Sequence, residues 1–188
     1  GETPLAPTVF TDVPAGAWYA GAVQDVVANG LMQGVSGGLF APDMTVSRAM
    51  VATVLYRMSG ETYTGGSAFP DVESGSWYAQ AVGWASQAGV VTGYDTGIFA
   101  PNDPVTREQL AAMLYRYQSH MGGSTAGGSA LDAYPDEGQV SAYARDAMSW
   151  AVGAGLLQGR DGGLLAPAGQ STRAELATIL SRYLALEG

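Results

Sequence analysis

Three arginines at matching positions are the strongest candidates for chemistry in this sequence. Each follows a hydroxyl residue and precedes an apolar stretch of helical period: Ser47-Arg48, Thr106-Arg107 and Thr172-Arg173. The hydroxyl residue is placed to cap a helix, and Thr106 with Gln109 and Thr172 with Glu175 have the spacing of a capping box. A cation at the first helical position opposes the helix dipole, by about 0.3–1 kcal/mol at an exposed site. Three such arginines therefore indicate a specific role.

Two roles are open for these arginines. A helix N-terminus beside a guanidinium group suits a carboxylate or phosphate, because backbone N–H groups and the planar fork can both donate to the anion. On this hypothesis, Arg107→Ala weakens ligand binding and leaves the fold intact. Alternatively, each arginine forms a salt bridge to an aspartate elsewhere in the chain.

Composition limits the kind of protein that this chain can be. The 188 residues are 47% hydrophobic and 13% charged, with no cysteine, so we expect a globular protein without disulfides or thiolate chemistry. A net charge of −9 argues against general affinity for nucleic acid or anionic lipid, and no apolar run is long enough to cross a bilayer. All eight positive charges are arginines, and His120 is the single histidine, which argues against a histidine-based metal or triad site. The acidic residues could suit calcium, but no Asp-x-Asp-x-Asp-Gly loop is present, so neither a metal nor a cofactor is expected. No signal peptide is present, and we expect Gly1 to begin a mature fragment.

The chain contains three copies of one unit. The first motif is Phe-Thr-Asp-Val at 10–13, Phe-Pro-Asp-Val at 69–72 and Tyr-Pro-Asp-Glu at 134–137. A Trp-Tyr pair follows at 18–19 and 77–78, with Ala-Tyr at 142–143, and a glycine-containing loop ends in Ala-Pro at 41–42, 100–101 and 166–167. This register predicts repeats at 10–60, 69–118 and 134–184, joined by flexible Gly/Ser-rich linkers at 60–68 and 121–130.

Each repeat predicts a helix, a loop and a second helix. The first helices are expected at 22–30, 81–89 and 147–155, each ending at a glycine, and the second helix of the first repeat at about 47–58. One such pair of helices has too little core to be stable alone, so we predict that three repeats pack together as one pseudo-threefold, all-α domain over residues 1–188.

The order of these motifs resembles the surface-layer homology (SLH) domain family. The shared features are the Phe-x-Asp-Val start, the Trp-Tyr pair, the Gly-x-x-x-Gly-x-Phe-x-Pro loop and the Thr-Arg-Ala-Glu helix start, and they extend over residues 10–184. The resemblance implies a three-pronged spindle whose second helices form a central three-helix bundle. It also implies an extracellular module at the surface or wall of a Gram-positive-type cell. Such a module would bind a secondary cell-wall polysaccharide, often bearing a pyruvate ketal, in grooves between repeats.

The resemblance places Arg48, Arg107 and Arg173 on the ketal carboxylate. The other candidate ligand-binding residues are the aspartates, tryptophans, cap hydroxyls and loop glycines at equivalent positions: Asp12, Asp71, Asp136, Trp18, Trp77, Ser47, Thr106, Thr172, Gly34, Gly93, Gly159, Gly38, Gly97 and Gly163.

Other interpretations stay open for most of this set. The aspartates could equally hold a turn, Trp18 and Trp77 are more often core residues than sugar platforms, and turn geometry alone explains the glycines. Two further groups are interpreted as structural: the second arginines of each repeat (Arg57, Arg116, Arg182), which fall on a different helix face, and the tryptophans of the helical stripe (Trp84, Trp150).

The leading functional hypothesis is a non-catalytic carbohydrate-binding anchor, and the alternative is a self-association module of a surface-layer lattice. An enzyme is disfavoured, because the carboxylate pair Asp136-Glu137 has no counterpart in the other repeats. The third repeat departs from the pattern with Ala142 for tryptophan and Leu165 for phenylalanine. We therefore expect unequal grooves, the better ones using the first two repeats.

Overall fold

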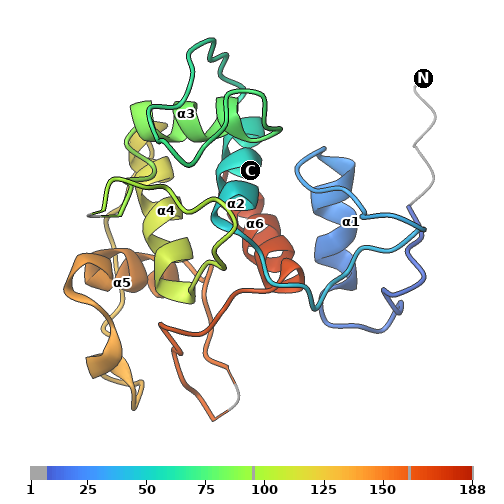
Figure 1. Ribbon diagram of the computed structural model, residues 1–188. Helices are drawn as coiled ribbons and strands as arrows, with labels where there is room; N and C mark the ends of the chain where they lie inside the picture. The colour runs from blue at the N-terminus through green and yellow to red at the C-terminus, as the bar shows by residue number, and fades with distance from the viewer. Residues whose placement is uncertain (1–7, 95, 161, 188) are drawn as a thin grey trace. The chain divides into compact units, whose positions relative to one another are not determined.

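A computed structural model describes residues 8–94, 96–160 and 162–187, and within these residues the chain is all-α (Figure 1). The described residues contain isolated β-bridges but no β-strand, which confirms the predicted class. The helices are α1 (Ala20–Ala28), α2 (Arg48–Ser59), α3 (Ala79–Gln87), α4 (Arg107–His120), the 3-10 helices η1 (Glu137–Gln139) and η2 (Ala142–Ala144), α5 (Arg145–Gly153) and α6 (Arg173–Glu187).

The helices belong to two compact units, Gly1–Met44 with Thr172–Gly188, and Thr45–Ser171. In the first unit α1 contacts α6, and in the second α2 contacts α3 and α4 contacts α5. In every pair, the second helix of one repeat contacts the first helix of another: the first repeat with the second, the second with the third, and the third with the first. The packing partners are therefore offset from the sequence repeats. The predicted spindle with its central bundle involves both units and stays a prediction.

The second helices begin at the predicted hydroxyl caps. Thr106 and Gln109 form a complete capping box, in which the Thr106 hydroxyl accepts from the Gln109 N–H and the Gln109 side chain accepts from the Thr106 N–H. The Ser47 hydroxyl accepts from the Met50 N–H, and the Thr172 hydroxyl from the Glu175 N–H. Each cap satisfies a donor that a helix start leaves unpaired.

The first helices begin about two residues earlier than predicted, and the glycine lies just beyond the end of the helix. Gly30, Gly89 and Gly155 have φ angles of 69°, 75° and 76°, a left-handed conformation that glycine adopts without the Cβ penalty. In the first repeat the Leu31 N–H then donates to the Val26 carbonyl, which closes the helix. A glycine does mark the end of each first helix, as predicted. It lies at C′, just after the helix, and not in the last turn.

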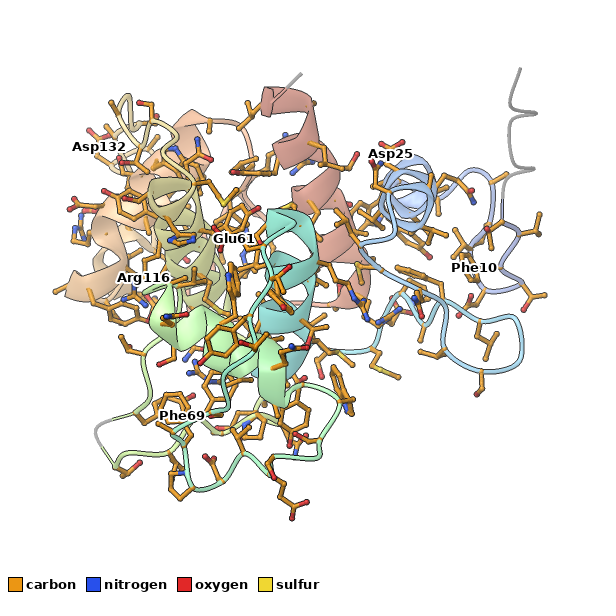
Figure 2. All side chains as sticks on the ribbon, turned by 90° about the horizontal axis from the view of Figure 1, so that it is seen from above. Phe10, Asp25, Glu61, Phe69, Arg116 and Asp132 are labelled. Atoms are coloured by element: carbon orange, nitrogen blue, oxygen red, sulfur yellow. The ribbon has the colours of Figure 1, made fainter. Side chains whose placement is uncertain are left out.

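Both predicted linkers are held against helices. Gln80 donates to the carbonyl of Tyr63, and Trp84 Nε1 donates to Glu61 at 2.6 Å, so residues 61–63 lie against α3 (Glu61 is labelled in Figure 2). In the second linker, Ser129 N–H donates to the Ser149 carbonyl at 2.9 Å and Ser149 Oγ donates back to the Ser129 carbonyl at 2.7 Å. Part of each linker therefore contacts a helix, and the flexibility expected from Gly/Ser content stays a prediction.

Three equivalent residues form a closed ring of backbone hydrogen bonds in the second unit. Val46 N–H donates to the Ser171 carbonyl, Ser171 N–H to the Val105 carbonyl, and Val105 N–H to the Val46 carbonyl, over 2.9, 2.9 and 3.0 Å. All three residues have no exposed surface. The Ser171 hydroxyl forms no hydrogen bond with the described residues, although it is buried. The ring ties all three repeats together immediately before their arginine motifs.

Candidate functional site

The backbone donors at the start of each second helix are already in use. The N–H groups of Arg48 and Ala49 donate to the carbonyls of Asp103 and Pro101, and the third donor is taken by the Ser47 cap. The same arrangement recurs at the other two helix starts. The Arg107 N–H donates to the Gly169 carbonyl, and the Arg173 N–H donates to the Met44 carbonyl. These helix starts therefore do not form the predicted dipole-assisted anion site, because protein carbonyls and cap hydroxyls occupy their donors.

The side chains of the three motif arginines make equivalent contacts to a loop of another repeat. Arg48 Nε and Nη2 donate to the carbonyls of Phe99 and Thr92 at 2.8 and 3.1 Å. Arg107 contacts Leu165 and Gln158 at 2.8 and 2.6 Å, and Arg173 contacts Phe40 and Gln33 at 2.8 and 2.5 Å. The arginines are only 6%, 4% and 7% exposed. Within the described residues, these hydrogen bonds join one repeat to the next through backbone carbonyls. Each arginine also lowers the pKa of the motif aspartate that holds the same loop, through its positive charge.

The three motif aspartates hold the same loops from inside their own repeats. Both oxygens of Asp71 accept backbone hydrogen bonds, from Phe99 at 2.9 Å and Ala100 at 2.7 Å, and Asp12 and Asp136 make the equivalent pairs of bonds. Ala100 has a φ of 57°, which is unfavourable for a residue with a Cβ, and its equivalents share this conformation. Of the open roles, holding a turn is the one that the structure shows.

Two different structural features explain why glycine occurs at these loop positions. Gly38, Gly97 and Gly163 have positive φ angles of 74°, 82° and 72°. Gly93 lacks this feature, but a Cβ there would lie 2.5 Å from the Phe69 ring, and Gly34 has the same relation to Phe10. At Gly93 and Gly34 the close approach is thus to the protein's own aromatic ring. Turn geometry and close approach of a ligand were the two predicted roles, and these contacts belong to the first.

The two motif tryptophans are exposed, in contrast to the core position that was their commoner interpretation. Trp18 and Trp77 are 68% and 65% exposed, and each contacts the following tyrosine edge to face at 5.1 and 5.0 Å between ring centroids. Trp84 and Trp150 are 3% and 4% exposed, which confirms that they pack in the core.

A pocket of about 340 Å³ lies in the second unit, and residues from all three repeats line it. The first repeat supplies Arg48 and the third supplies Tyr143. The second repeat supplies residues 91–94 and one face of α4, with Gln109, Ala112, Met113 and Arg116. No acidic side chain lines the pocket in the part of the chain that the structure describes.

Arginines and tyrosines define the chemistry of this pocket. Arg48 Cζ lies 4.7 Å from the ring centroids of both Tyr94 and Phe99, so its guanidinium group is fixed by cation–π contacts as well as by hydrogen bonds. Arg116 (labelled in Figure 2) is half-buried and forms no hydrogen bond or ion pair with the described residues. Partial burial raises the pKa of Tyr143, and the negative charge of Glu108 adds to this effect. The pocket can therefore offer a positively charged group and aromatic edges to an anionic, partly apolar ligand.

The sequence prediction and the pocket share only Arg48 and Gly93. The pocket also contains Arg116, which was interpreted as structural, and Tyr94, Gln109 and Tyr143, which were not among the predicted site residues. Two of these positions vary among the repeats: Tyr94 corresponds to Val35 and Arg160, and Gln109 to Met50 and Glu175. A search for residues that recur in all three repeats overlooks such positions. The signal that could have found them is a residue that differs from its equivalents in the other two repeats.

The cyclic arginine–loop contacts and the offset helix pairs define a three-repeat helical module. Residues 9–50, 68–111 and 133–177 each match the S-layer homology domain, and the chain belongs to this family. Membership of this family indicates a location at the cell surface or cell wall.

Several curated proteins are similar to the chain over most of its length. An amylopullulanase of Thermoanaerobacterium thermosulfurigenes is 31% identical over 91% of the chain, and a surface-layer 125 kDa protein of Lysinibacillus sphaericus is 30% identical over 87%. A cellulosome-anchoring protein of Acetivibrio thermocellus is 26% identical over 81%. The chain spans only 9%, 14% and 35% of these three relatives. Among the described residues, no helix has the length and apolarity needed to cross a membrane.

Proposed function

We propose that the chain is a non-catalytic anchoring module that binds a secondary cell-wall polysaccharide through an anionic sugar, one that carries a pyruvate ketal. Family membership supports an anchoring role, because relatives include surface-layer and cellulosome-anchoring proteins. The observation that carries the ligand assignment is the pocket lined by Arg48, Arg116, Tyr94 and Tyr143.

The size and lining of the pocket suit one charged sugar residue. Its volume of about 340 Å³ is near the lower end of the range of about 300–1,000 Å³ that small-molecule sites occupy. Two arginines, with no acid among the described lining residues, favour an anion. The planar guanidinium group matches a carboxylate with two parallel hydrogen bonds. The tyrosine rings can contact the apolar face of a pyranose, and Gln109 and the Thr92 carbonyl can pair with hydroxyl groups.

The two arginines have different roles in this proposal. Arg48 uses Nε and Nη2 on the carbonyls of the loop, so it positions the wall of the pocket and adds positive charge. Arg116 has no hydrogen-bond or ion-pair partner among the described residues and is the main carboxylate contact. This assignment moves the anion contact from the motif arginine to the second arginine of the repeat.

Calorimetry with cell-wall polysaccharide fragments, before and after removal of the ketal, tests the proposal. We expect the ketal-bearing fragment to bind and the stripped fragment to bind far more weakly. Arg116→Gln should lower the affinity by about ten- to a hundredfold, because a charge-assisted contact contributes about 1.5–3 kcal/mol. Arg116→Lys keeps the positive charge but loses the planar guanidinium fork. Its affinity should lie between those of the wild type and Arg116→Gln.

Arg145→Gln is the matched control. Arg145 is an exposed arginine paired with Glu137, so its removal changes the net charge equally without touching the pocket lining. Equal losses in the Arg116→Gln and Arg145→Gln variants would mean that only overall charge matters. Absence of binding by the wild-type chain, together with reversible self-association in sedimentation, would favour the lattice module instead.

A further inference from the structure

One wall of the pocket comes from the third repeat. Tyr143 belongs to the third repeat, whereas the rest of the lining except Arg48 belongs to the second. Tyr143 lies in η2, a single short turn between Val140 and α5, and its side chain is 55% exposed. A three-residue turn has little hydrogen bonding of its own, so other contacts must fix the position of Tyr143.

A buried carboxylate provides these contacts. Glu108, the second residue of α4, is only 9% exposed, and both of its oxygens bind the same residue. Oε2 accepts from the Ser141 N–H at 2.8 Å, and Oε1 accepts from the Ser141 hydroxyl at 2.6 Å. Ser141 is the N-cap of η2 and stands two residues before Tyr143. The carboxylate thus connects α4, which forms one side of the pocket, to the turn that forms the other.

This connection exists at one repeat boundary only. The positions equivalent to Glu108 are Ala49 and Ala174, which have no side-chain acceptor. Contact between neighbouring repeats therefore does not in general require this carboxylate, since the arginine–loop contacts are present at all three boundaries. The exception coincides with a boundary that contributes to the pocket lined by Arg48, Arg116 and Tyr143.

We propose that Glu108 is a positioning residue for the ligand pocket, acting by fixing Ser141 and thereby the Tyr143 wall. This inference rests on the proposed function for its effect on ligand affinity, but the structural connection itself can be tested without ligand. Glu108 does not line the pocket, so its contribution passes through the position of Tyr143.

The sign of the effect on affinity separates positioning from simple electrostatics. Removal of a negative charge near the pocket by itself favours an anionic ligand, so electrostatics alone predicts tighter binding in any neutral variant. Positioning predicts that Glu108→Ala binds the ketal-bearing wall fragment about three- to tenfold more weakly, the scale of a lost aromatic contact. Glu108→Gln keeps an acceptor for the Ser141 N–H and a donor for its hydroxyl, and should bind at least as tightly as the wild type.

Calorimetry on four proteins tests whether the effect passes through Tyr143: wild type, Glu108→Ala, Tyr143→Ala and the double variant. The result expected is no additional loss from Glu108→Ala once Tyr143 is absent. Val82→Ala serves as a stability control, because it removes buried volume from α3 and should lower stability without changing affinity. Wild-type affinity in Glu108→Ala, or an equal loss in the presence and absence of Tyr143, would overturn the proposal.

A ligand-free measurement distinguishes failure of this inference from failure of the proposed function. The ultraviolet titration of Tyr143 is isolated as the difference between each protein and its Tyr143→Phe counterpart. Its pKa should fall in Glu108→Ala by more than in Glu108→Gln, because only the alanine variant releases the turn as well as removing the charge. If the wild type does not bind the fragment, the proposed function is refuted. The titration still tests whether Glu108 fixes the position of Tyr143. Equal shifts in the two variants would refute the positioning role.

Discussion

Replacement of Arg107 by alanine should destabilise the fold, contrary to the expectation that a ligand-binding arginine can be removed without structural cost. The side chain donates two hydrogen bonds to the carbonyls of Leu165 and Gln158 and is only 4% exposed. A hydrogen bond from a charged group contributes about 1.5–3 kcal/mol, which gives about 3–6 kcal/mol for the pair. The variant no longer has to bury a guanidinium group, and this offsets part of the loss. We expect a net decrease of about 2–4 kcal/mol in the free energy of unfolding.

Urea unfolding followed by circular dichroism, with thermal melting in parallel, measures this decrease. For a chain of this size, each kcal/mol lowers the Tm by about 2–4 °C, so the midpoint should fall by roughly 5–15 °C. Arg145→Ala is the control, because its exposed pair with Glu137 should contribute less than about 1 kcal/mol. A loss for Arg107→Ala below about 0.5 kcal/mol, at an unchanged m-value, would show that the arginine–loop contacts do not hold the repeats together.

Three further predictions concern the same framework. Ser171→Val should raise the free energy of unfolding by about 1 kcal/mol, measured by urea titration. The variant replaces a buried hydroxyl without a hydrogen bond by valine, the residue at the two equivalent ring positions. A decrease would indicate that the site has no room for the larger side chain. Gly93→Ala should lower stability by about 1–3 kcal/mol, because its Cβ would lie 2.9 Å from the Ile98 carbonyl oxygen, whereas Gly75→Ala, with open space around its Cβ, should be nearly neutral. Acid should unfold the chain partly through Asp71. Burial raises its pKa, but backbone hydrogen bonds and the positive charge of Arg48 together outweigh this and lower it. Its contribution is therefore present above the ordinary aspartate pKa of about 3.9 and is lost as the pH falls through the lowered value, so Asp71→Asn should flatten the decline in stability below about pH 4.

Local chemistry accounts for the features that the sequence predicted well. The Ser47 and Thr106 caps depend on residues within one turn, and the helix-ending Gly30 depends on its own φ angle. These interactions are decided over three or four residues, so a repeated pattern of hydroxyl and glycine residues is enough to locate them. The family resemblance added the three-repeat organisation, which the family match confirms.

The pairing of helices and the pocket could not be predicted in the same way. Which first helix packs against α2 depends on contacts between repeats, and an apolar stripe on α2 is compatible with several partners. Arg116 and Tyr143 meet at the pocket because α4 and η2 are neighbours in space, although they are far apart in the sequence. The repeated pattern located the motif arginines, but whether an arginine faces a ligand or a carbonyl depends on the path of a loop that no local pattern specifies.

The closed ring of Val46, Val105 and Ser171 sets a limit on how such a protein can change in evolution. In a linear repeat array, the terminal units have a free side, and units can be added or lost there. Here each repeat both gives and receives a ring hydrogen bond, so no repeat is terminal and the repeat number is fixed at three. Loss or duplication of a single repeat opens the ring, whereas duplication of the whole module preserves it. Moving the chain ends to another linker also preserves the ring, since its closure is not covalent. Such chains should therefore evolve by copying or permuting complete sets of three.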